Sequence, residues 1–353
     1  MRVHGGRWAD YLETKGALPL DFSSNVSPLG MPACARIAAT VALETADRYP
    51  DPECRELRHA LAKRHSLSPD AILCGNGAGD LIDRLALAAR PREVLVTAPT
   101  FGEYRAAFER VGSTVREWTL AEGDDFLLDE AFLGHITEGT GVVVLCEPNN
   151  PTGRTTDAAL LDAVADRCQA TGTLLVVDEC FLDFVEDGAK KSLLGRVSAT
   201  ETGAPILVLR AFTKFYGMAG LRLGWCASRD QGLLSAMADA GQPWPVSSLA
   251  QAAGVAALAD EDYAQELRAL MVRERPYLAA GLGALGCRVV PGEANYLLFF
   301  VEACDLSAQL EARGVLIRDC RDYAGLGPGW YRVAVRTRVE DDRLLRAMEG
   351  VLR

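Results

Sequence analysis

The chain has 353 residues, of which 49% are hydrophobic and 24% charged, a composition typical of globular proteins rather than disordered ones. Its 37 basic and 48 acidic residues give a net charge of −11, which disfavours a nucleic-acid binder because phosphate contacts need clustered Lys and Arg. Any anionic ligand must therefore be held by a few local cations. The length predicts a large domain with a smaller one.

The cysteines predict a reducing environment. The ten of them are about 3% of the chain, below the roughly 8–10% of a disulfide scaffold, and none forms a Cys-x-x-Cys pair. The start of the chain lacks the apolar core of a signal peptide, and no run approaches the ~20 apolar residues of a membrane span. We expect a soluble cytoplasmic protein with no membrane or nucleic-acid partner.

The predicted elements begin with an N-terminal arm. Residues 1–30 show little periodicity, and Pro28 and Gly30 favour an extended course. Between residues 31 and 242, short apolar runs alternate with stretches of helical spacing, including Asp80–Ala89 and Ala158–Gln169. Such alternation predicts an α/β domain with a mainly parallel sheet. The predicted strands are Ala71–Cys74, Val94–Thr97, Val142–Cys146, Leu174–Val177, Ile206–Leu209 and Leu223–Ala227.

The pattern changes near Gly241–Pro245, where two prolines flank a tryptophan and predict a domain junction. Ser247–Leu258 and Tyr263–Leu282 are predicted as long helices, the second interrupted at Pro276. Residues 243–353 are therefore predicted to form a smaller α+β C-terminal domain. Its predicted strands are Cys287–Val290, Asn295–Phe300, Val315–Arg318 and Trp330–Val335.

Polar residues follow several predicted strands, where open α/β sheets bind ligands. The loop Gly75–Gly79 leads into a helix and offers backbone N–H groups to a phosphate, although a tight turn also explains it. It lacks the dinucleotide spacing and the P-loop lysine. Pro148–Gly153, with the sequence Pro-Asn-Asn-Pro-Thr-Gly, forms a second turn after a strand.

Two charged positions stand out after later strands. Asp178 and Glu179 end the run Leu174–Val177, where a carboxylate caps, forms a salt bridge or holds a cationic ring nitrogen. Lys214 follows Ile206–Leu209 among three aromatic residues. Partial desolvation there lowers the pKa of an amine and makes Lys214 a Schiff-base candidate.

In this order, the motifs resemble those of the fold-type I pyridoxal-phosphate enzymes, in the branch that contains histidinol-phosphate aminotransferases and threonine-phosphate decarboxylases. The resemblance extends from His4 to Thr337. It implies pyridoxal 5'-phosphate as cofactor and a large domain with a mainly parallel sheet beside a smaller α+β domain. No metal site is expected.

The resemblance implies roles around the cofactor ring. Lys214 would hold the cofactor covalently and move the proton at the substrate carbon. Asp178 would pair with the ring nitrogen, and Asn150 would bond the ring hydroxyl and border the substrate. Phe101 would stack on the ring, with Tyr104 nearby.

The resemblance also implies how the cofactor phosphate is held. The backbone N–H groups of Gly77 and Ala78, the Thr213 hydroxyl and the Arg222 guanidinium would bind it. Tyr49 would reach the phosphate from a partner subunit. A homodimer is therefore implied.

Arg332 matches the arginine that holds the substrate carboxylate. For a phosphate on the substrate, the candidates are His4 and Asn25 from the arm, with Arg336 and Arg154 as cations. Each of these has an alternative interpretation as a solvated or locally bonded surface residue.

Local segments favour the decarboxylases within this branch. They are His4–Gly6, Asp21–Gly30 and Gln242–Val246, together with Phe181, where the aminotransferases usually carry Tyr. The implied reaction converts L-threonine O-3-phosphate to (R)-1-amino-2-propanol O-2-phosphate, a linker precursor in cobalamin biosynthesis. L-Serine O-phosphate stays open, because one methyl group gives only ~1–3 kcal/mol of discrimination.

Two other functions compete with this interpretation. The alternative enzyme is a histidinol-phosphate aminotransferase or a related class I/II aminotransferase. A cofactor-binding regulator without activity is disfavoured, because Lys214, Asp178 and Arg332 are all present and no DNA-binding module is visible.

Overall fold

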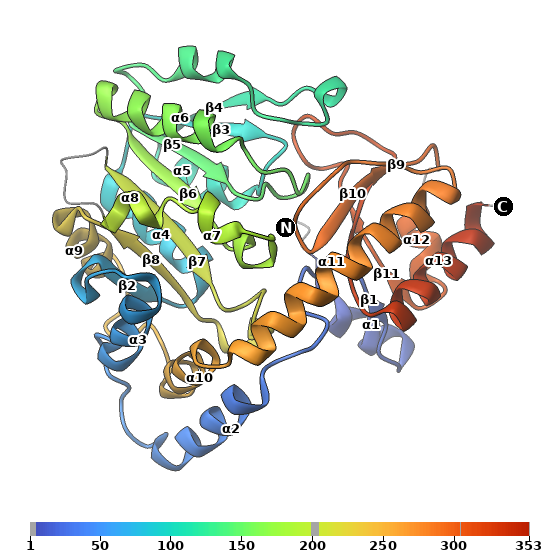
Figure 1. Ribbon diagram of the computed structural model, residues 1–353, viewed down its shortest axis with the longest axis horizontal. Helices are drawn as coiled ribbons and strands as arrows, with labels where there is room; N and C mark the ends of the chain where they lie inside the picture. Colours follow the sequence, from blue (N-terminus) through green and yellow to red (C-terminus); the bar gives the residue numbers. More distant parts are fainter. Residues whose placement is uncertain (1–4, 199–204, 304, 353) are drawn as a thin grey trace.

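A seven-stranded sheet forms the centre of the large domain in the computed structural model, which describes residues 5–198, 205–303 and 305–352 (Figure 1). The strand order is β2-β8-β7-β6-β5-β3-β4, and β8 runs antiparallel to both of its neighbours while the other pairs are parallel. The strands are β2 (Ile72–Gly75), β3 (Glu93–Ala98), β4 (Thr114–Thr119), β5 (Val142–Cys146), β6 (Leu174–Asp178), β7 (Ile206–Ala211) and β8 (Gly224–Ser228).

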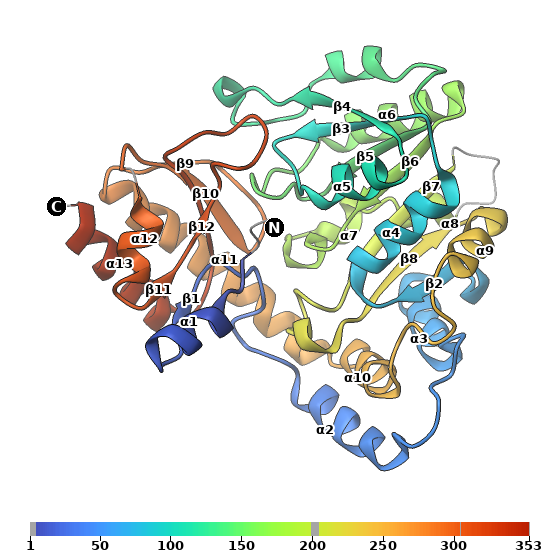
Figure 2. The same cartoon turned by 180° about the vertical axis from the view of Figure 1, so that it is seen from behind.

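Helices cover both faces of this sheet, which explains why its strands are continuous apolar runs. In Figure 1 the helices α6, α7 and α8 lie in front of the sheet, and Figure 2 shows α4, α5 and α9 on the opposite face. Every position of β5 and β6 is buried. The helices of the large-domain range are α2 (Ala33–Ala42), α3 (Arg55–His65), α4 (Gly77–Ala89), α5 (Glu103–Arg110), α6 (Ala158–Thr171), α7 (Gly188–Lys191), α8 (Leu194–Ser198) and α9 (Gln231–Asp239).

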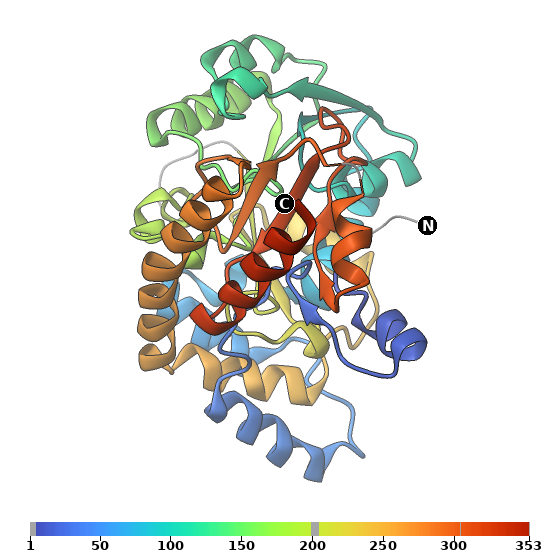
Figure 3. The same ribbon diagram turned by 90° about the vertical axis from the view of Figure 1, so that its right-hand side faces the viewer.

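The small domain is built on an antiparallel sheet in the order β12-β13-β10-β9. Figure 3 shows α11 and α13 next to each other across the outer side of this sheet. Its strands are β9 (Arg288–Val289), β10 (Tyr296–Phe300), β11 (Val315–Leu316), β12 (Arg318–Asp319) and β13 (Trp330–Ala334), and β11 lies outside the four-stranded sheet. The helices here are α10 (Ser248–Leu258), α11 (Glu261–Ala284), α12 (Leu306–Glu311) and α13 (Arg338–Leu352).

The predicted α/β class and mainly parallel sheet are confirmed. The predicted strands of the large domain appear with small shifts at their ends. The edge strand β4 was not predicted, because its sequence Thr-Val-Arg-Glu-Trp-Thr has no apolar run and its positions are exposed or half-buried. An edge strand has only one neighbour, so it does not need the apolar pattern of a central strand.

Two local predictions are wrong. The helix α11 passes through Pro276 without interruption, because its apolar face, including Leu270, Leu278 and Leu282, is buried against the rest of the protein and offsets the missing backbone hydrogen bond. The arm is not simply extended, since it contains α1 (Trp8–Lys15).

After α1, the arm joins the small domain through β1 (Leu20–Asp21), which pairs in parallel with β11. The Leu20 amide donates to the Gly314 carbonyl at 2.8 Å, and the Ala334 amide donates to the Phe22 carbonyl at 2.8 Å. The helix α10 packs against α2 and α3 of the large domain. The domain boundaries at residues 30 and 242 stay predictions. None of the described helices is long and apolar enough to cross a membrane.

Candidate active site

A cavity of about 600 Å³ lies where the carboxyl ends of β5, β6 and β7 face the small domain. Parallel strands place the residues that follow them at one edge of the sheet, and this convergence brings motifs from distant parts of the chain together. Most residues predicted for the site line the cavity. They are Asn25, Ala78, Phe101, Asn150, Asp178, Thr213, Lys214, Arg222 and Arg332.

Lys214 follows β7 and enters the cavity with its amine 5.9 Å from the centre of the Phe181 ring. Burial lowers the pKa of Lys214 to about 8, and the positive charge of Arg332 acts in the same direction. A substantial fraction of the amine is therefore neutral near physiological pH. A neutral amine is the form that attacks a carbonyl group.

Asp178 and Glu179 lie on opposite sides of the chain at the end of β6, because successive side chains alternate in an extended strand. Asp178 lines the cavity, where its Oδ2 accepts a hydrogen bond from the Tyr104 hydroxyl at 2.6 Å. Glu179 instead accepts from the buried guanidinium of Arg210 at 2.7 and 3.0 Å. Asp178 is the carboxylate that is available to a ligand, and Glu179 is a structural partner.

The N-terminus of α4 forms a cradle for a phosphate. Gly77 has a φ of 81°, and a Cβ atom at this position would lie 2.7 Å from Nη2 of Arg222. Glycine is required both by the backbone conformation and by the close approach of the guanidinium. The first N–H groups of this helix have no intrahelical acceptors, and Arg222 forms no ion pair with any described residue.

Arg332 and Arg318 enter the cavity from neighbouring strands of the small domain. They lie directly opposite each other on β13 and β12, so both side chains project from the same face of the sheet. Arg318 forms two hydrogen bonds of 2.8 Å with the Asp322 carboxylate. Arg332 is 5% exposed, and its guanidinium donates to Asn150 Oδ1 and to the Ser23 carbonyl. Within the described ranges it has no carboxylate partner, and its Nε makes no hydrogen bond.

Asn25 also has an unsatisfied polar atom in the cavity, because its buried Oδ1 accepts no hydrogen bond from the residues that the structure describes. Sequence reasoning missed Arg318, which ends the predicted strand Val315–Arg318. An arginine at the end of a strand does not by itself indicate a function. The functional interpretation of Arg318 depends on its position opposite Arg332, which the sequence does not show.

Other predicted residues lie elsewhere. His4 is outside the described residues. Tyr49 is 78% exposed, and its ring stacks on Trp244 at 4.3 Å outside this cavity. Arg336 does not line the cavity either, because its guanidinium bonds Glu340 at 2.7 to 2.9 Å. Arg154 donates to the Pro291 carbonyl, away from the cavity. The substrate roles of Arg336 and Arg154 stay predictions that this geometry does not support.

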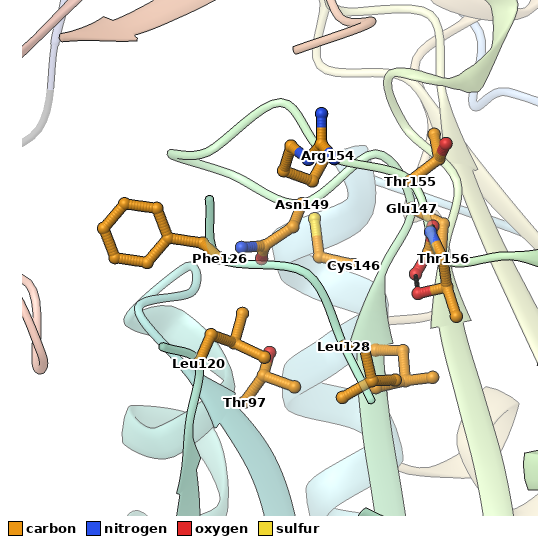
Figure 4. Close-up of a pocket in the computed structure, with 11 residues that line it drawn as sticks. Thr97, Leu120, Phe126, Leu128, Cys146, Glu147, Asn149, Arg154, Thr155 and Thr156 are labelled. Atoms are coloured by element: carbon orange, nitrogen blue, oxygen red, sulfur yellow. Dashed lines mark hydrogen bonds between the residues drawn. The ribbon is translucent and has the colours of Figure 1, made fainter. Parts of the chain in front are cut away.

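Hydrogen bonds around a second cavity of about 20 Å³ hold the turn that carries Asn150 in place (Figure 4). The buried Glu147 carboxylate accepts hydrogen bonds from the amide and hydroxyl of Thr156. Burial raises the pKa of Glu147 to about 7. Asn149 donates to the Pro99 carbonyl at 2.9 Å and accepts from the Thr100 hydroxyl at 2.8 Å. These bonds hold the turn so that Asn150 faces the main cavity.

Comparison with known proteins identifies the family. Residues 19–349 match the model of the family described as aminotransferase class I and II. This chain belongs to that family. It is 37% identical over 356 residues to the threonine-phosphate decarboxylase of Salmonella typhimurium, covering 99% of this chain and 96% of that protein. It is 34% identical to a histidinol-phosphate aminotransferase of Nitratidesulfovibrio vulgaris, covering 94% and 88% of the two chains.

Solved structures of the family share the fold. The histidinol-phosphate aminotransferase of Clostridium acetobutylicum superposes with a TM-score of 0.87 at 25% identity, covering 94% of this chain and 98% of that one. The enzyme from Sinorhizobium meliloti, solved in complex with pyridoxal-5'-phosphate, superposes with a TM-score of 0.85 at 23% identity, covering 100% of this chain and 95% of that one. The predicted enzyme family and its pyridoxal phosphate cofactor are confirmed.

The groups in the cavity fit this cofactor. The space above Gly77 that a Cβ atom would fill, beside the Arg222 guanidinium, suits a phosphate. Lys214 supplies an amine with a lowered pKa, and Asp178 supplies a buried carboxylate for a protonated ring nitrogen. Thr213 and Phe101 line the same cavity.

Proposed function

We propose that this protein decarboxylates L-threonine O-3-phosphate to (R)-1-amino-2-propanol O-2-phosphate. The observation that carries the proposal is the pair of buried guanidinium groups, Arg318 and Arg332, that share the cavity with Arg222. If Arg222 binds the cofactor phosphate, Arg318 and Arg332 are left to bind a substrate that has two anionic groups. The identity to the Salmonella typhimurium threonine-phosphate decarboxylase, which covers nearly the full chain, supports the same substrate.

The charges of the cavity suit such a substrate. Like charges directly opposite on neighbouring strands repel each other, and only Arg318 of the pair has a carboxylate partner among the described residues. We assign the substrate carboxylate to Arg332 and the substrate phosphate to Arg318, with Asn25 as a further polar contact. Histidinol phosphate has a phosphate but no carboxylate, so under this assignment it would leave Arg332 without an anion.

When bound, the cofactor supplies an electron sink for the pair of electrons that is released at Cα. Arg332 and Arg318 would orient the substrate by its two anionic groups, and this orientation would decide which bond at Cα breaks. If that bond is Cα–COO⁻, carbon dioxide leaves and Lys214 can return a proton to Cα. Asp178 would keep the ring nitrogen protonated. Phe181 has no hydroxyl to offer the cofactor.

We further propose that the active form is a homodimer in which Tyr49 of the partner subunit reaches the cofactor phosphate. Exposed apolar side chains gather on and after α2, including Ile37, Val41 and Leu43, and the stacked rings of Tyr49 and Trp244 are also exposed. Large exposed apolar groups of this kind mark protein interfaces. The Tyr49 ring does not line the cavity of its own chain.

Hybrid dimers test this arrangement. Subunits with Lys214→Ala are mixed with subunits with Tyr49→Ala, and the activity is compared with that of each homodimer. If each site combines Lys214 of one subunit with Tyr49 of the other, the hybrid has one intact site and activity returns. If Tyr49 serves its own chain, both sites of the hybrid are defective and the mixture is no more active than the homodimers.

The cytoplasm is the proposed location, and the cobalamin linker is the proposed destination of the product. The cysteines in the described part of the chain are all free thiols, which supports a reducing compartment. The amino alcohol phosphate that the reaction would make is the linker precursor implied by the resemblance to the decarboxylases.

The reaction itself is tested by incubating the purified yellow protein with L-threonine O-3-phosphate in the absence of any keto acid. We expect release of CO₂ and formation of 1-amino-2-propanol phosphate. A parallel reaction with L-serine O-phosphate measures the contribution of the methyl group. We expect kcat/KM for threonine phosphate to exceed that for serine phosphate by a factor of about 5 to 150. Turnover of histidinol phosphate that depends on 2-oxoglutarate, without CO₂ release from threonine phosphate, would instead support the aminotransferase.

A further inference from the structure

We propose that the buried hydroxyl of Tyr104 is a positioning group that holds the Asp178 carboxylate toward the ring nitrogen of the cofactor. The proposal rests on the pyridoxal phosphate site and does not depend on whether the enzyme decarboxylates or transaminates its substrate. It gives Tyr104 a function that acts through Asp178.

Tyr104 is in the first turn of α5 and is 1% exposed. Its hydroxyl donates to Oδ2 of Asp178 at 2.6 Å, a length typical of a bond to a charged acceptor. On the other side, the backbone amide of Cys180 donates to Oδ1 at 3.0 Å. Each oxygen of the carboxylate therefore has one fixed donor. Two donors on different oxygens fix the plane of the carboxylate while lone pairs remain for a third donor from the cavity.

The surroundings make this support necessary. Asp178 is 5% exposed and forms no ion pair with any described residue, although Lys214 lies in the same cavity. Burial disfavours a charged carboxylate, and hydrogen bonds to the charged form favour it. Among the nearby ionisable groups, the thiols of Cys146 and Cys180 are neutral because burial raises the pKa of both, whereas the Lys214 amine interacts electrostatically with Asp178 across the cavity. The two fixed hydrogen bonds replace part of the hydration that the buried carboxylate loses.

Tyr104 is suited to donate at every physiological pH. Burial and the charge of Asp178 raise the pKa of its hydroxyl well above the ordinary value, so the proton stays on the tyrosine oxygen. Its ring is packed edge-on against Phe101 at 5.5 Å, which restricts rotation of the side chain. Phe101 is the residue predicted to stack on the cofactor ring. Tyr104 therefore contacts two groups that are predicted to bind the cofactor, the Asp178 carboxylate and the Phe101 ring.

Removal of this hydroxyl leaves Oδ2 of a buried carboxylate without its donor. The carboxylate then keeps one fixed donor, on Oδ1, and its plane is no longer held toward the ring nitrogen of the cofactor. Cofactor binding should weaken, and turnover by the bound cofactor should slow. A residue that only filled space would lower stability without changing turnover.

The test uses Tyr104→Phe, which keeps the ring and removes only the oxygen. The dissociation constant of pyridoxal phosphate is measured by its visible absorbance on the full-length apoprotein between pH 5.5 and 8.5. We expect a dissociation constant about 10- to 100-fold above that of the wild type, the effect of one hydrogen bond to a charged group. Turnover by the loaded variant should show a lower kcat with a KM within about twofold of the wild-type value.

Tyr331→Phe is the matched control, because Tyr331 is also fully buried and its hydroxyl donates to the Ala303 carbonyl at 2.8 Å, away from the cavity. The thermal stability of both apoproteins is measured beside cofactor binding. Tyr331→Phe should lose stability and keep the wild-type dissociation constant. The proposal is overturned if Tyr104→Phe binds the cofactor as the wild type does at all pH values, or if the two variants lose affinity equally.

Discussion

Replacement of Lys214 by Ala is expected to abolish covalent attachment of the cofactor and to lower turnover by at least about 10³-fold. In the proposed mechanism Lys214 supplies both the attached amine and the proton donor at Cα, and general acid–base catalysis alone contributes about 10²- to 10⁴-fold. The visible absorbance of the attached cofactor and the release of CO₂ measure the two effects. A Lys214→Ala protein that, after borohydride reduction, retained a covalently bound cofactor on denaturation would place the attachment at a different lysine.

The same residue sets how cofactor capture depends on pH. Only the neutral amine attacks the cofactor carbonyl, so the rate of attachment to the apoprotein should rise as the pH increases. Because burial and Arg332 lower the pKa of Lys214 to about 8, the rate should reach half of its maximum near that pH. An amine with the ordinary pKa of 10.5 would show a rate that still increased steeply above pH 9.

Arg332→Gln is expected to lower kcat/KM for threonine phosphate by about 30-fold to several thousand-fold. The change removes one partner of a buried charge pair, which costs about 2–5 kcal/mol. The amino alcohol phosphate product has no carboxylate, and its affinity should therefore change little. Measurement of substrate kinetics together with product binding separates the two anionic groups.

Arg318→Gln is the comparison variant for this experiment, since Arg318 lies opposite Arg332 on the same face of the sheet. If Arg318 binds the phosphate, its loss should lower the affinity for the substrate and for the product alike. If both variants lowered the affinity for the product equally, the assignment of the carboxylate to Arg332 would be contradicted.

Local patterns in the sequence were sufficient for much of the fold. The run Val142–Cys146 became β5 with the predicted bounds, because a strand covered on both faces needs apolar side chains at every position. Pro276 shows the limit of such patterns. A proline destabilises a helix locally, and for this reason an interruption was predicted. The helix α11 nevertheless continues through Pro276, because its contacts with other elements stabilise it.

The site was also predictable where a motif has a fixed place relative to a strand. Lys214, Asp178 and the Gly75–Gly79 loop each follow a strand of the large sheet, and parallel strands bring such residues to one edge. The residues alone did not distinguish Asp178 from Glu179, because the two are adjacent and chemically alike, and only the resemblance to the pyridoxal-phosphate enzymes assigned the ring nitrogen to Asp178. The direction of each side chain at the end of β6 separated them, with Glu179 bound to Arg210.

The sequence by itself determined the order of the elements, the cofactor family and the residues that follow the strands of the large sheet. Only the tertiary structure decided which of the remaining cations face the ligand. The −11 net charge required local cations for any anion, and the pairing of β12 with β13 placed Arg318 opposite Arg332 while Arg336 bonded Glu340 outside the cavity. Strand register and contacts between domains join residues that are distant in sequence, and local patterns carry little information about such pairs.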